Sequence, residues 1–161
     1  MSGAFESLAG ELDYPMFIVT AAERGERDGC LVGFATQCSI HPPRFLACIS
    51  NKNRTYRIAE DSGTLVVHVV PEGAADLVEL FGGETGDEVD KMARVEWSEG
   101  PDGVPVLARC PNWFAGAVLR RVRLGDHVGF LLEPVAGGHG DPGERAFPFS
   151  RAKGIEAGHE P

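Results

Sequence analysis

The sequence predicts a mainly β domain, with about seven strands in a closed, mostly antiparallel barrel and a few short helices at its rim. Runs of β-branched and other apolar residues recur at short intervals, turn residues separate them, and strands do not alternate with long helices. At 161 residues, with 43% apolar and 24% charged residues, the chain has the size and composition of one globular domain. We therefore expect a single domain over residues 1–161, with an N-terminal arm at 1–13 and a C-terminal tail at 137–161.

The first half of the chain holds the strands that begin this barrel. A weak helical pattern marks the arm, Tyr14-Pro15 ends it, and residues 16–21 carry the β-branched residues of a strand. A charged turn with glycines joins this strand to a second one at 30–36, which predicts a hairpin. The elements expected next are an apolar strand at 44–50 after Pro42-Pro43, a short helix at 55–60 and the strongest strand, TLVVHVV, at 64–70.

The second half of the chain contains two helical patterns followed by four strands. Leucine, valine and phenylalanine at helical spacing predict a helix at 74–81, and a second short helix is expected at 87–92. The expected strands are short ones at 95–97 and 105–109 around the turn GPDG, and longer ones at 113–123 and 127–134. Glycine and proline dominate after residue 137, which is typical of a tail.

Charge, hydropathy and cysteine spacing exclude several classes of protein. A formal net charge of −9 argues against a nucleic-acid-binding protein, which needs a basic face. No apolar run approaches the length that spans a bilayer, and the N-terminus lacks the basic and apolar regions of a secretory signal, so we expect no membrane contact and a cytoplasmic location. The cysteines lack the paired spacing of zinc ligands, which predicts buried free thiols and no metal site at Cys30, Cys38, Cys48 and Cys110.

Several short motifs occur in a fixed order along most of the chain. They are Asp28-Gly29, Ser39-Ile40-His41-Pro42-Pro43, Ser50-Asn51-Lys52-Asn53-Arg54-Thr55, Phe81, Lys91-Met92, GVPVL at 103–107 and Gly125-Asp126-His127. In this order and spacing they resemble the flavin reductase-like family, whose fold is the FMN-binding split β-barrel of the Greek-key type. The resemblance implies a homodimer with a non-covalently bound flavin, FMN or alternatively FAD, which NAD(P)H reduces.

The chain departs from the family pattern directly after the opening glycine. The family commonly has a Thr-x-Ser-Ser run here, which supplies hydroxyl and backbone contacts to the flavin, whereas this chain has Leu31, Val32, Gly33 and Phe34. The resemblance then implies that main-chain groups from Gly33 to Ala35 hold the flavin at this place. Gly33 would let the ring approach the backbone closely, or it relieves a bulge in a barrel strand.

The loop after the strand at 44–50 is the candidate phosphate site. A strand ends here and a predicted helix begins, and main-chain N–H groups at a helix start bind anions together with cationic and hydroxyl side chains. The candidate ligands are Ser50, Asn51, Lys52, Arg54, Thr55 and Arg57. The alternative is a solvated basic loop. Thr36, Gln37 and Ser39 follow the opening strand and are candidates for the flavin pyrimidine edge or its ribityl hydroxyls. Capping of the turn by these side chains is the alternative.

Asp126 and His127 are the candidate catalytic pair. In reductases of the family that it resembles, the Gly-Asp-His sequence is associated with positioning of nicotinamide or flavin, and an aspartate can fix the orientation of a neighbouring imidazole. The alternative is a tight turn with two exposed polar side chains. His68 lies in an apolar strand, where a histidine satisfied by core or interface partners is more common than a ligand.

Three functions remain open at this point. The first is NAD(P)H-dependent reduction of FMN or FAD, with a flavin-dependent monooxygenase as the hypothetical user of the reduced flavin. The second is a flavin-binding module that receives electrons from another protein. The third is a split barrel that binds another cofactor, haem or deazaflavin, for which His68 and His127 are the candidate axial ligands of haem.

Overall fold

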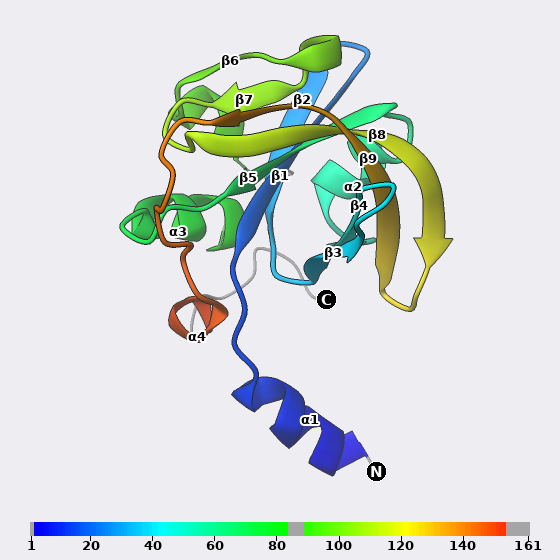
Figure 1. The fold of residues 1–161 in the computed structure, drawn as a ribbon, viewed down its shortest axis with the longest axis vertical. Coiled ribbons are helices and arrows are strands. Elements are labelled where there is room, and N and C mark those ends of the chain that lie inside the picture. The colour runs from blue at the N-terminus through cyan, green and yellow to red at the C-terminus, as the bar shows by residue number, and fades with distance from the viewer. Residues whose placement is uncertain (1, 84–88, 154–161) are drawn as a thin grey trace.

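The computed structural model describes residues 2–83 and 89–153, which form one curled antiparallel sheet with short helices around it (Figure 1). Its strands follow the order β2-β1-β5-β8-β9-β4-β3, and each neighbouring pair is antiparallel. The strands are β1 (Phe17–Glu23), β2 (Glu26–Val32), β3 (Ala35–Ser39), β4 (Arg44–Ser50), β5 (Thr64–Val69), β8 (Asn112–Arg123) and β9 (His127–His139). The predicted mainly β, antiparallel fold is confirmed.

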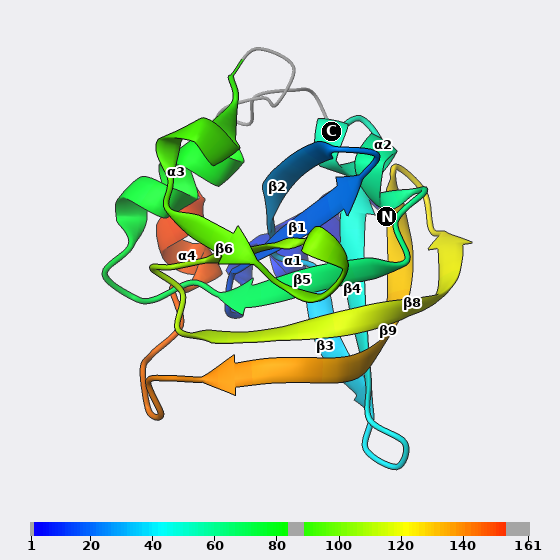
Figure 2. The ribbon, with the colours of Figure 1, turned by 90° about the horizontal axis from the view of Figure 1, so that it is seen from above.

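The remaining elements cover the sheet. A second sheet pairs β6 (Trp97–Glu99) with β7 (Pro105–Leu107), and 3-10 helices span Lys91–Arg94 and Pro101–Gly103. The α-helices are α1 (Ser2–Glu11), α2 (Arg54–Ala59), α3 (Ala75–Gly83) and α4 (Phe149–Ala152). Figure 2 shows α3 and α4 on one side of the curled sheet and α2 on the other. The helix expected at 87–92 falls partly on residues 84–88, outside the described residues.

The hydrogen-bonded sheet is open. Strands β2 and β3 are its two edges, and no ladder joins them within the described residues, so hydrogen bonds do not close the expected barrel. The two edge strands are nevertheless consecutive in the chain, because only Gly33-Phe34 separates them. The chain therefore passes from one free edge of the sheet to the other in two residues.

The first hairpin is longer than the charge pattern predicted. Only Arg24 and Gly25 form its turn, with φ of 53° and 81°, and this pair of positive φ angles suits a two-residue connection between twisted strands. Glu26 and Asp28, which belonged to the predicted charged turn, are the first residues of β2 instead. A carboxylate is thereby placed within a strand, and Asp28 is buried at 1% exposure.

Strand β1 is buried on both faces, which explains its unbroken apolar run. Val19 packs in a cluster between the curled strands and α2, together with Phe130. Its neighbour Ile18 points to the opposite face, in a second cluster with Phe81 of α3 and Phe147 of the C-terminal segment. The sheet therefore separates two apolar cores, and residues from near the end of the chain complete the second.

Part of the segment expected to be a tail is structured. Strand β9 continues to His139 because Gly137 and Gly138 let it lie directly on Trp113, where a Cβ at residue 138 would come within 2.5 Å of the indole Nε1. The chain then returns to the sheet, where the Phe147 N–H donates to the Val70 carbonyl at 2.8 Å. Phe147 is 2% exposed, so this return is part of the core.

His68 is a structural histidine, which confirms the interpretation of its apolar strand. Its Nδ1 lies 2.9 Å from the Ile18 carbonyl oxygen, and the Leu107 N–H donates to its Nε2 at 3.0 Å. A carbonyl only accepts and an amide N–H only donates, so the ring is neutral and carries its proton on Nδ1. Burial lowers the pKa of His68 to about 4.

All four cysteines are free, as predicted, but only two are buried. Cys30 and Cys110 lie in the core, where burial raises the pKa of each thiol to about 12 and keeps it in the unreactive protonated form. Cys48 is half-buried, and Cys38 is exposed because it lies on the edge strand β3 at a register shift of the ladder. The prediction of buried thiols is therefore wrong for Cys38.

Candidate functional site

The site is built around the two-residue crossing from β2 to β3. The Phe34 carbonyl accepts a hydrogen bond from the Cys48 N–H at 2.9 Å, and the Ala35 N–H donates to the Gly33 carbonyl at 3.1 Å. The first bond fixes the crossing to β4 and the second tightens its turn. Because β3 is an edge strand, the sheet does not use the main-chain groups on its outer side. On the other edge strand, β2, the buried Lys91 side chain donates to the Gly29 carbonyl at 3.3 Å.

The end of β4 and the start of β9 meet beside this crossing. Ser50 lies opposite His127 in the β4–β9 ladder, and the Asn51 N–H donates to the Asp126 carbonyl at 2.9 Å. The rings of Phe34 and His127 are 5.1 Å apart at an interplanar angle of 55°. The structure therefore gathers five of the predicted site residues in one place, which we call the mouth: Phe34, Ser50, Asn51, Asp126 and His127.

Asp126 orients the imidazole of His127. The Nδ1 of His127 lies 2.7 Å from the Asp126 Oδ1, and an ionised carboxylate only accepts, so Nδ1 carries a proton and donates. This hydrogen bond, the charge of the imidazole and the charge of Lys52 lower the pKa of Asp126 below its ordinary value. Asp126 therefore stays ionised at neutral pH, and its hydrogen bond engages Nδ1 of His127 and leaves Nε2 out of this contact.

An aromatic row continues from the mouth to the C-terminal segment. Tyr14 lies 6.4 Å from Phe34, measured between ring centroids, and stacks on Phe149 at 4.6 Å with an interplanar angle of 12°. Sequence reasoning missed this row. Tyr14 was interpreted only as a helix breaker, and no local pattern connects it to residue 34 or 149.

The basic loop is satisfied mainly by its own neighbours. Arg54 Nη1 lies 3.5 Å from Oδ2 of the buried Asp28, and Arg54 Nη2 lies 3.7 Å from Glu26. Thr55 is fully buried. The Asn53 side chain accepts a hydrogen bond from the Thr55 N–H at 2.9 Å, so Asn53 caps the start of α2. Of the candidate phosphate ligands, Arg54 and Thr55 are thus turned toward the protein.

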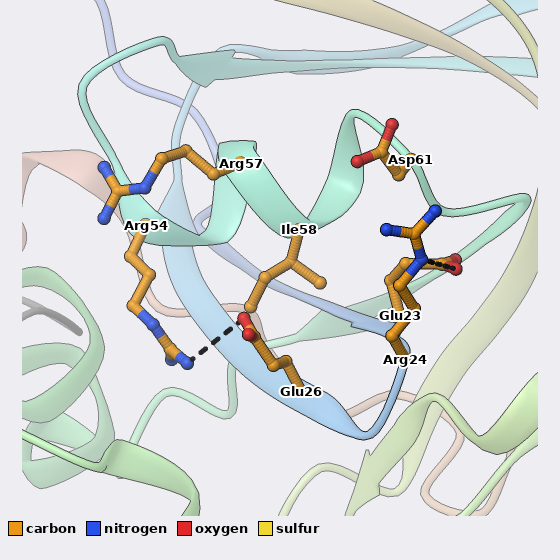
Figure 3. A pocket seen from close by; sticks show the side chains of 7 residues that line it. All are labelled: Glu23, Arg24, Glu26, Arg54, Arg57, Ile58 and Asp61. Carbon is orange, nitrogen blue, oxygen red and sulfur yellow. Dashed lines mark ion pairs between the residues drawn. The ribbon is translucent and has the colours of Figure 1, made fainter.

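Arg54 also lines a shallow pocket beside the tip of the β1–β2 hairpin, with a volume of about 190 Å³ (Figure 3). Three acidic and three basic side chains surround it with one isoleucine: Glu23, Glu26, Asp61, Arg24, Arg54, Arg57 and Ile58. Two ion pairs lie in this pocket: Arg24 is 3.8 Å from Glu23, and Arg54 is 3.7 Å from Glu26. The acidic side chains balance the arginines, which disfavours a phosphate, and the mouth residues do not line this pocket.

The three polar residues predicted to face the flavin pyrimidine edge lie on β3. The Thr36 hydroxyl donates to the Gln37 carbonyl at 3.0 Å, and the Gln37 amide donates to the Ser39 carbonyl at 3.1 Å. These are the local contacts expected of residues that stabilise a turn. Thr36 and Gln37 are exposed, so both remain accessible from the β3 edge.

The structure removes one of the two candidate haem ligands, His68. No group of three or more histidine, cysteine, aspartate and glutamate side chains in the described ranges is arranged to hold a metal ion. Both ring nitrogens of His68 bind main-chain groups, so this residue is unsuited to ligate haem iron. Among the described helices, none has the length and apolar character needed to cross a membrane.

The mouth combines the kinds of group that the ring system of a flavin requires. An isoalloxazine needs an apolar face, main-chain donors and acceptors at its polar edge, and a defined polar group near its reactive part. Phe34 offers an apolar face, and the free edge of β3 offers main-chain donors and acceptors. His127, held by Asp126, is a polar group in a defined orientation. Of the candidate phosphate ligands, Arg54 pairs with Asp28, whereas the buried Thr55 hydroxyl has no hydrogen-bond partner among the described residues.

Comparisons with known proteins agree with this geometry. FMN reductase (NADH) RutF from Pseudomonas syringae pv. syringae (strain B728a) is 28% identical over 132 residues, which are 82% of this chain and 74% of the relative. The reductase subunit HsaB of a flavin-dependent monooxygenase from Rhodococcus jostii (strain RHA1) is 32% identical over 107 residues, 64% of this chain and 51% of HsaB. The crystal structure of an FMN-binding protein from Thermus thermophilus with bound 1-cyclohex-2-enone matches with a TM-score of 0.77 and 26% identity, covering 84% of this chain and 78% of that one.

The match extends over nearly all described elements. The chain spans 35% of the length of a probable flavin reductase from Rhizobium meliloti (strain 1021) and 77% of the length of RutF from Ancylobacter novellus. A family model described as a flavin reductase like domain matches residues 9–153, from the end of α1 to the end of α4. The chain therefore belongs to the flavin reductase like domain family.

Proposed function

We propose that this protein is an NAD(P)H:flavin oxidoreductase, which transfers a hydride from NADH or NADPH to FMN or FAD. The observation that carries the proposal is the Asp126–His127 pair beside Phe34, at the point where the chain crosses from one edge strand of the sheet to the other. A bound flavin supplies the hydride chemistry itself, so the protein needs only to bind and orient the two partners.

Each mouth residue has a distinct part in this proposal. His127 directs its Nε2 toward the reacting rings, and Asp126 keeps the imidazole in one orientation and one tautomer. Main-chain groups of Gly33, Phe34 and Ala35 and the edge residues Thr36, Gln37 and Ser39 bind the polar edge of the flavin. Ser50, Asn51 and Lys52 remain the proposed ligands toward its phosphate, with Arg54, Thr55 and Arg57 as supports of the loop.

Replacing His127 by alanine is expected to lower the rate of NADH oxidation with FMN by about 10- to 100-fold, because the reacting rings lose their fixed orientation. Asp126→Asn should cause a smaller loss, since the imidazole stays but can rotate. Steady-state NADH absorbance with purified protein and excess FMN measures both. His139→Ala, an exposed histidine at the other end of β9, serves as the matched control and should retain the wild-type rate.

The same assay decides between the enzyme and the flavin-binding module. Oxidation of NADH or NADPH that depends on added flavin supports the enzyme. A flavin that stays oxidised with both nucleotides, yet is reduced by a protein electron donor, would contradict the proposal and support the module. No bound flavin in any form would contradict both.

The proposal extends to the assembly in which the protein works. We infer a cytoplasmic homodimer whose curled sheet forms the closed, Greek-key split barrel that the family resemblance implies. A flavin-dependent monooxygenase is the proposed user of the reduced flavin, and the similarity to HsaB, which is named as the reductase subunit of such an enzyme, supports this choice. Sedimentation at micromolar concentration tests the homodimer, and a monomer would contradict it.

A further inference from the structure

Helix α1 carries an apolar stripe that its own chain does not cover. The side chains of Phe5, Leu8 and Leu12 follow one another at helical spacing and are 66%, 59% and 55% exposed. From Gly3 to Asp13 only Ala9 is half-buried, and Figure 1 shows α1 standing clear of the sheet. A helix of ten residues is marginally stable in water by itself, because most helical stability in proteins comes from packing of such a face. The stripe therefore needs a partner that covers it.

The attachment of α1 to the C-terminal segment keeps the stripe away from its own sheet. The N–H and the hydroxyl of Ser150 both donate to the Asp13 carboxylate, at 2.9 and 2.8 Å, and these bonds lower the pKa of Asp13. The Lys153 ammonium donates to the Gly10 carbonyl in the last turn of the helix. These contacts hold the end of α1 beside α4. The surface that covers the stripe must therefore come from outside this copy of the chain.

A second apolar surface lies on the outer face of β4, β8 and β9. The Leu46 and Leu124 side chains meet over Gly129, where each has a Cδ1 atom 3.1 Å from the position of an added Cβ. Val122 lies opposite Gly129 in the β8–β9 ladder, and Leu131 lies opposite Leu46 in the β4–β9 ladder, so both share this face. Leu124 is 57% exposed and Val122 is 36% exposed. We call these three leucines and one valine the outer patch.

The charges beside the two surfaces are of opposite sign. Glu6 and Glu11 lie on either side of the stripe, and α1 contains no basic residue. Arg120 lies on the outer face of β8, at the border of the outer patch, where the acidic Glu133 is already paired with Arg44 at 3.3 Å. The side chains of Glu6, Glu11 and Arg120 form no hydrogen bond or ion pair with another residue in the described ranges. An acidic helix with an apolar stripe thus complements an apolar patch with a basic border.

We propose that α1 of one copy docks on the outer patch of a second copy, whose own α1 docks on the first, so that two exchanged helices hold the dimer together. The proposal rests on the homodimer proposed above, because it names the contact that holds the two copies. Each stripe and each patch loses its exposed apolar surface in this exchange. The Leu124 N–H donates to the His127 carbonyl at 3.0 Å, so the partner's helix lies beside the turn that carries Asp126 and His127.

Sedimentation velocity of two variants and of their mixture tests this exchange. Leu8→Asp in the stripe and Leu124→Asp in the outer patch should each raise the Kd of the dimer by at least about 100-fold, because a symmetric dimer makes the contact twice. An equal mixture of the two variants should form a dimer at least about tenfold tighter than either variant alone, because one intact helix then meets one intact patch. Ser7→Asp, on the opposite face of α1, is the matched control and should change the Kd by less than about twofold.

Three results would overturn the proposal. An unchanged Kd in both Leu8→Asp and Leu124→Asp would show that other surfaces hold the copies together. A mixture that stays monomeric would show that the helix of one copy does not meet the patch of the other. A loss in Ser7→Asp as large as that in Leu8→Asp would show that the stripe has no special part in the contact.

A milder variant of the outer patch covers the case in which Leu124→Asp does not fold. Val122→Ser keeps a small side chain on the outer face of β8 and should raise the Kd of the dimer by about three- to tenfold. An unchanged Kd in Val122→Ser together with an unfolded Leu124→Asp would also count against the patch.

The sedimentation results and the NADH assay fail separately. A dimer that survives the changes in stripe and patch refutes the helix exchange and leaves the homodimer in place. A wild-type protein that is monomeric refutes both, whereas flavin-dependent oxidation of NADH by that monomer would still support the proposed activity.

Discussion

The Arg54→Met variant should unfold at a urea concentration about 1 M below that of the wild type, because it leaves the buried Asp28 carboxylate without its counter-ion. The Asp28 side chain is 2% exposed and its Oδ2 has no hydrogen-bond partner among the described residues, so the guanidinium at 3.5 Å is its main compensation. We expect a loss of about 2–3 kcal/mol in the free energy of unfolding. This is below the value for fully buried pairs, since the Arg54 side chain is 27% exposed.

Two further variants isolate the cause of that loss. Adding Asp28→Asn to Arg54→Met removes the unpaired charge and should recover most of the lost free energy of unfolding. Arg24→Met makes the same substitution at an arginine whose side chain is 87% exposed and 3.8 Å from Glu23, and should change stability by less than about 0.5 kcal/mol. If Arg24→Met and Arg54→Met were equally destabilising, the Arg54–Asp28 pair would have no special importance.

Acidification from pH 6.5 to pH 4 should remove about 3 kcal/mol of stability through His68 alone. The pKa of His68 is about 4 in the folded protein and near 6.5 when the chain is unfolded, because burial opposes the charged ring. Between these values the unfolded chain binds a proton that the folded protein does not. The stabilisation is therefore complete above pH 6.5 and decreases steadily as the pH falls toward 4.

Urea unfolding at half-unit steps of pH measures this dependence. His68→Gln should be less stable at pH 7, because it disturbs the contacts to Ile18 and Leu107, but the slope between pH 6.5 and 4 should flatten. His139→Gln, at an exposed histidine, should keep the wild-type slope. The carboxyls whose pKa values are lowered, Asp13, Asp76 and Asp126, begin to lose their stabilisation below about pH 5. They do so equally in the wild type and in both variants, so the difference in slope between His68→Gln and the wild type isolates His68.

Local patterns predicted the strands well where the residues themselves prefer a pleated surface. The run TLVVHVV and the apolar segment at 44–50 became β5 and β4 with almost the predicted bounds. The prediction ended β9 too early, at 134, because Gly137 and Gly138 are typical of loops. They lie in a strand because a distant residue, Trp113, needs a surface without side chains, and that requirement is not visible in the local sequence.

The candidate site was predictable as a set of motifs but not as a geometry. Motif order identified Ser50–Asn51 and Asp126–His127, and the β4–β9 register then placed them side by side. The pairing of Arg54 with Asp28 could not be predicted, because it depends on how α2 crosses β2. The same holds for Phe34, because its partner Tyr14 is twenty positions earlier in the chain and is itself stacked on Phe149.

The return of the C-terminal segment to the sheet determines when the molecule can fold during synthesis. Phe147 accepts a hydrogen bond from the Met16 N–H and donates one to the Val70 carbonyl, both at 2.8 Å, so it joins the first strand to the fifth. The second apolar core includes Ile18 near one end of the sequence and Ala152 near the other. A ribosome-bound chain therefore keeps that core open until Ala152 has emerged, and we expect this core to form after the strands of the sheet have been synthesised.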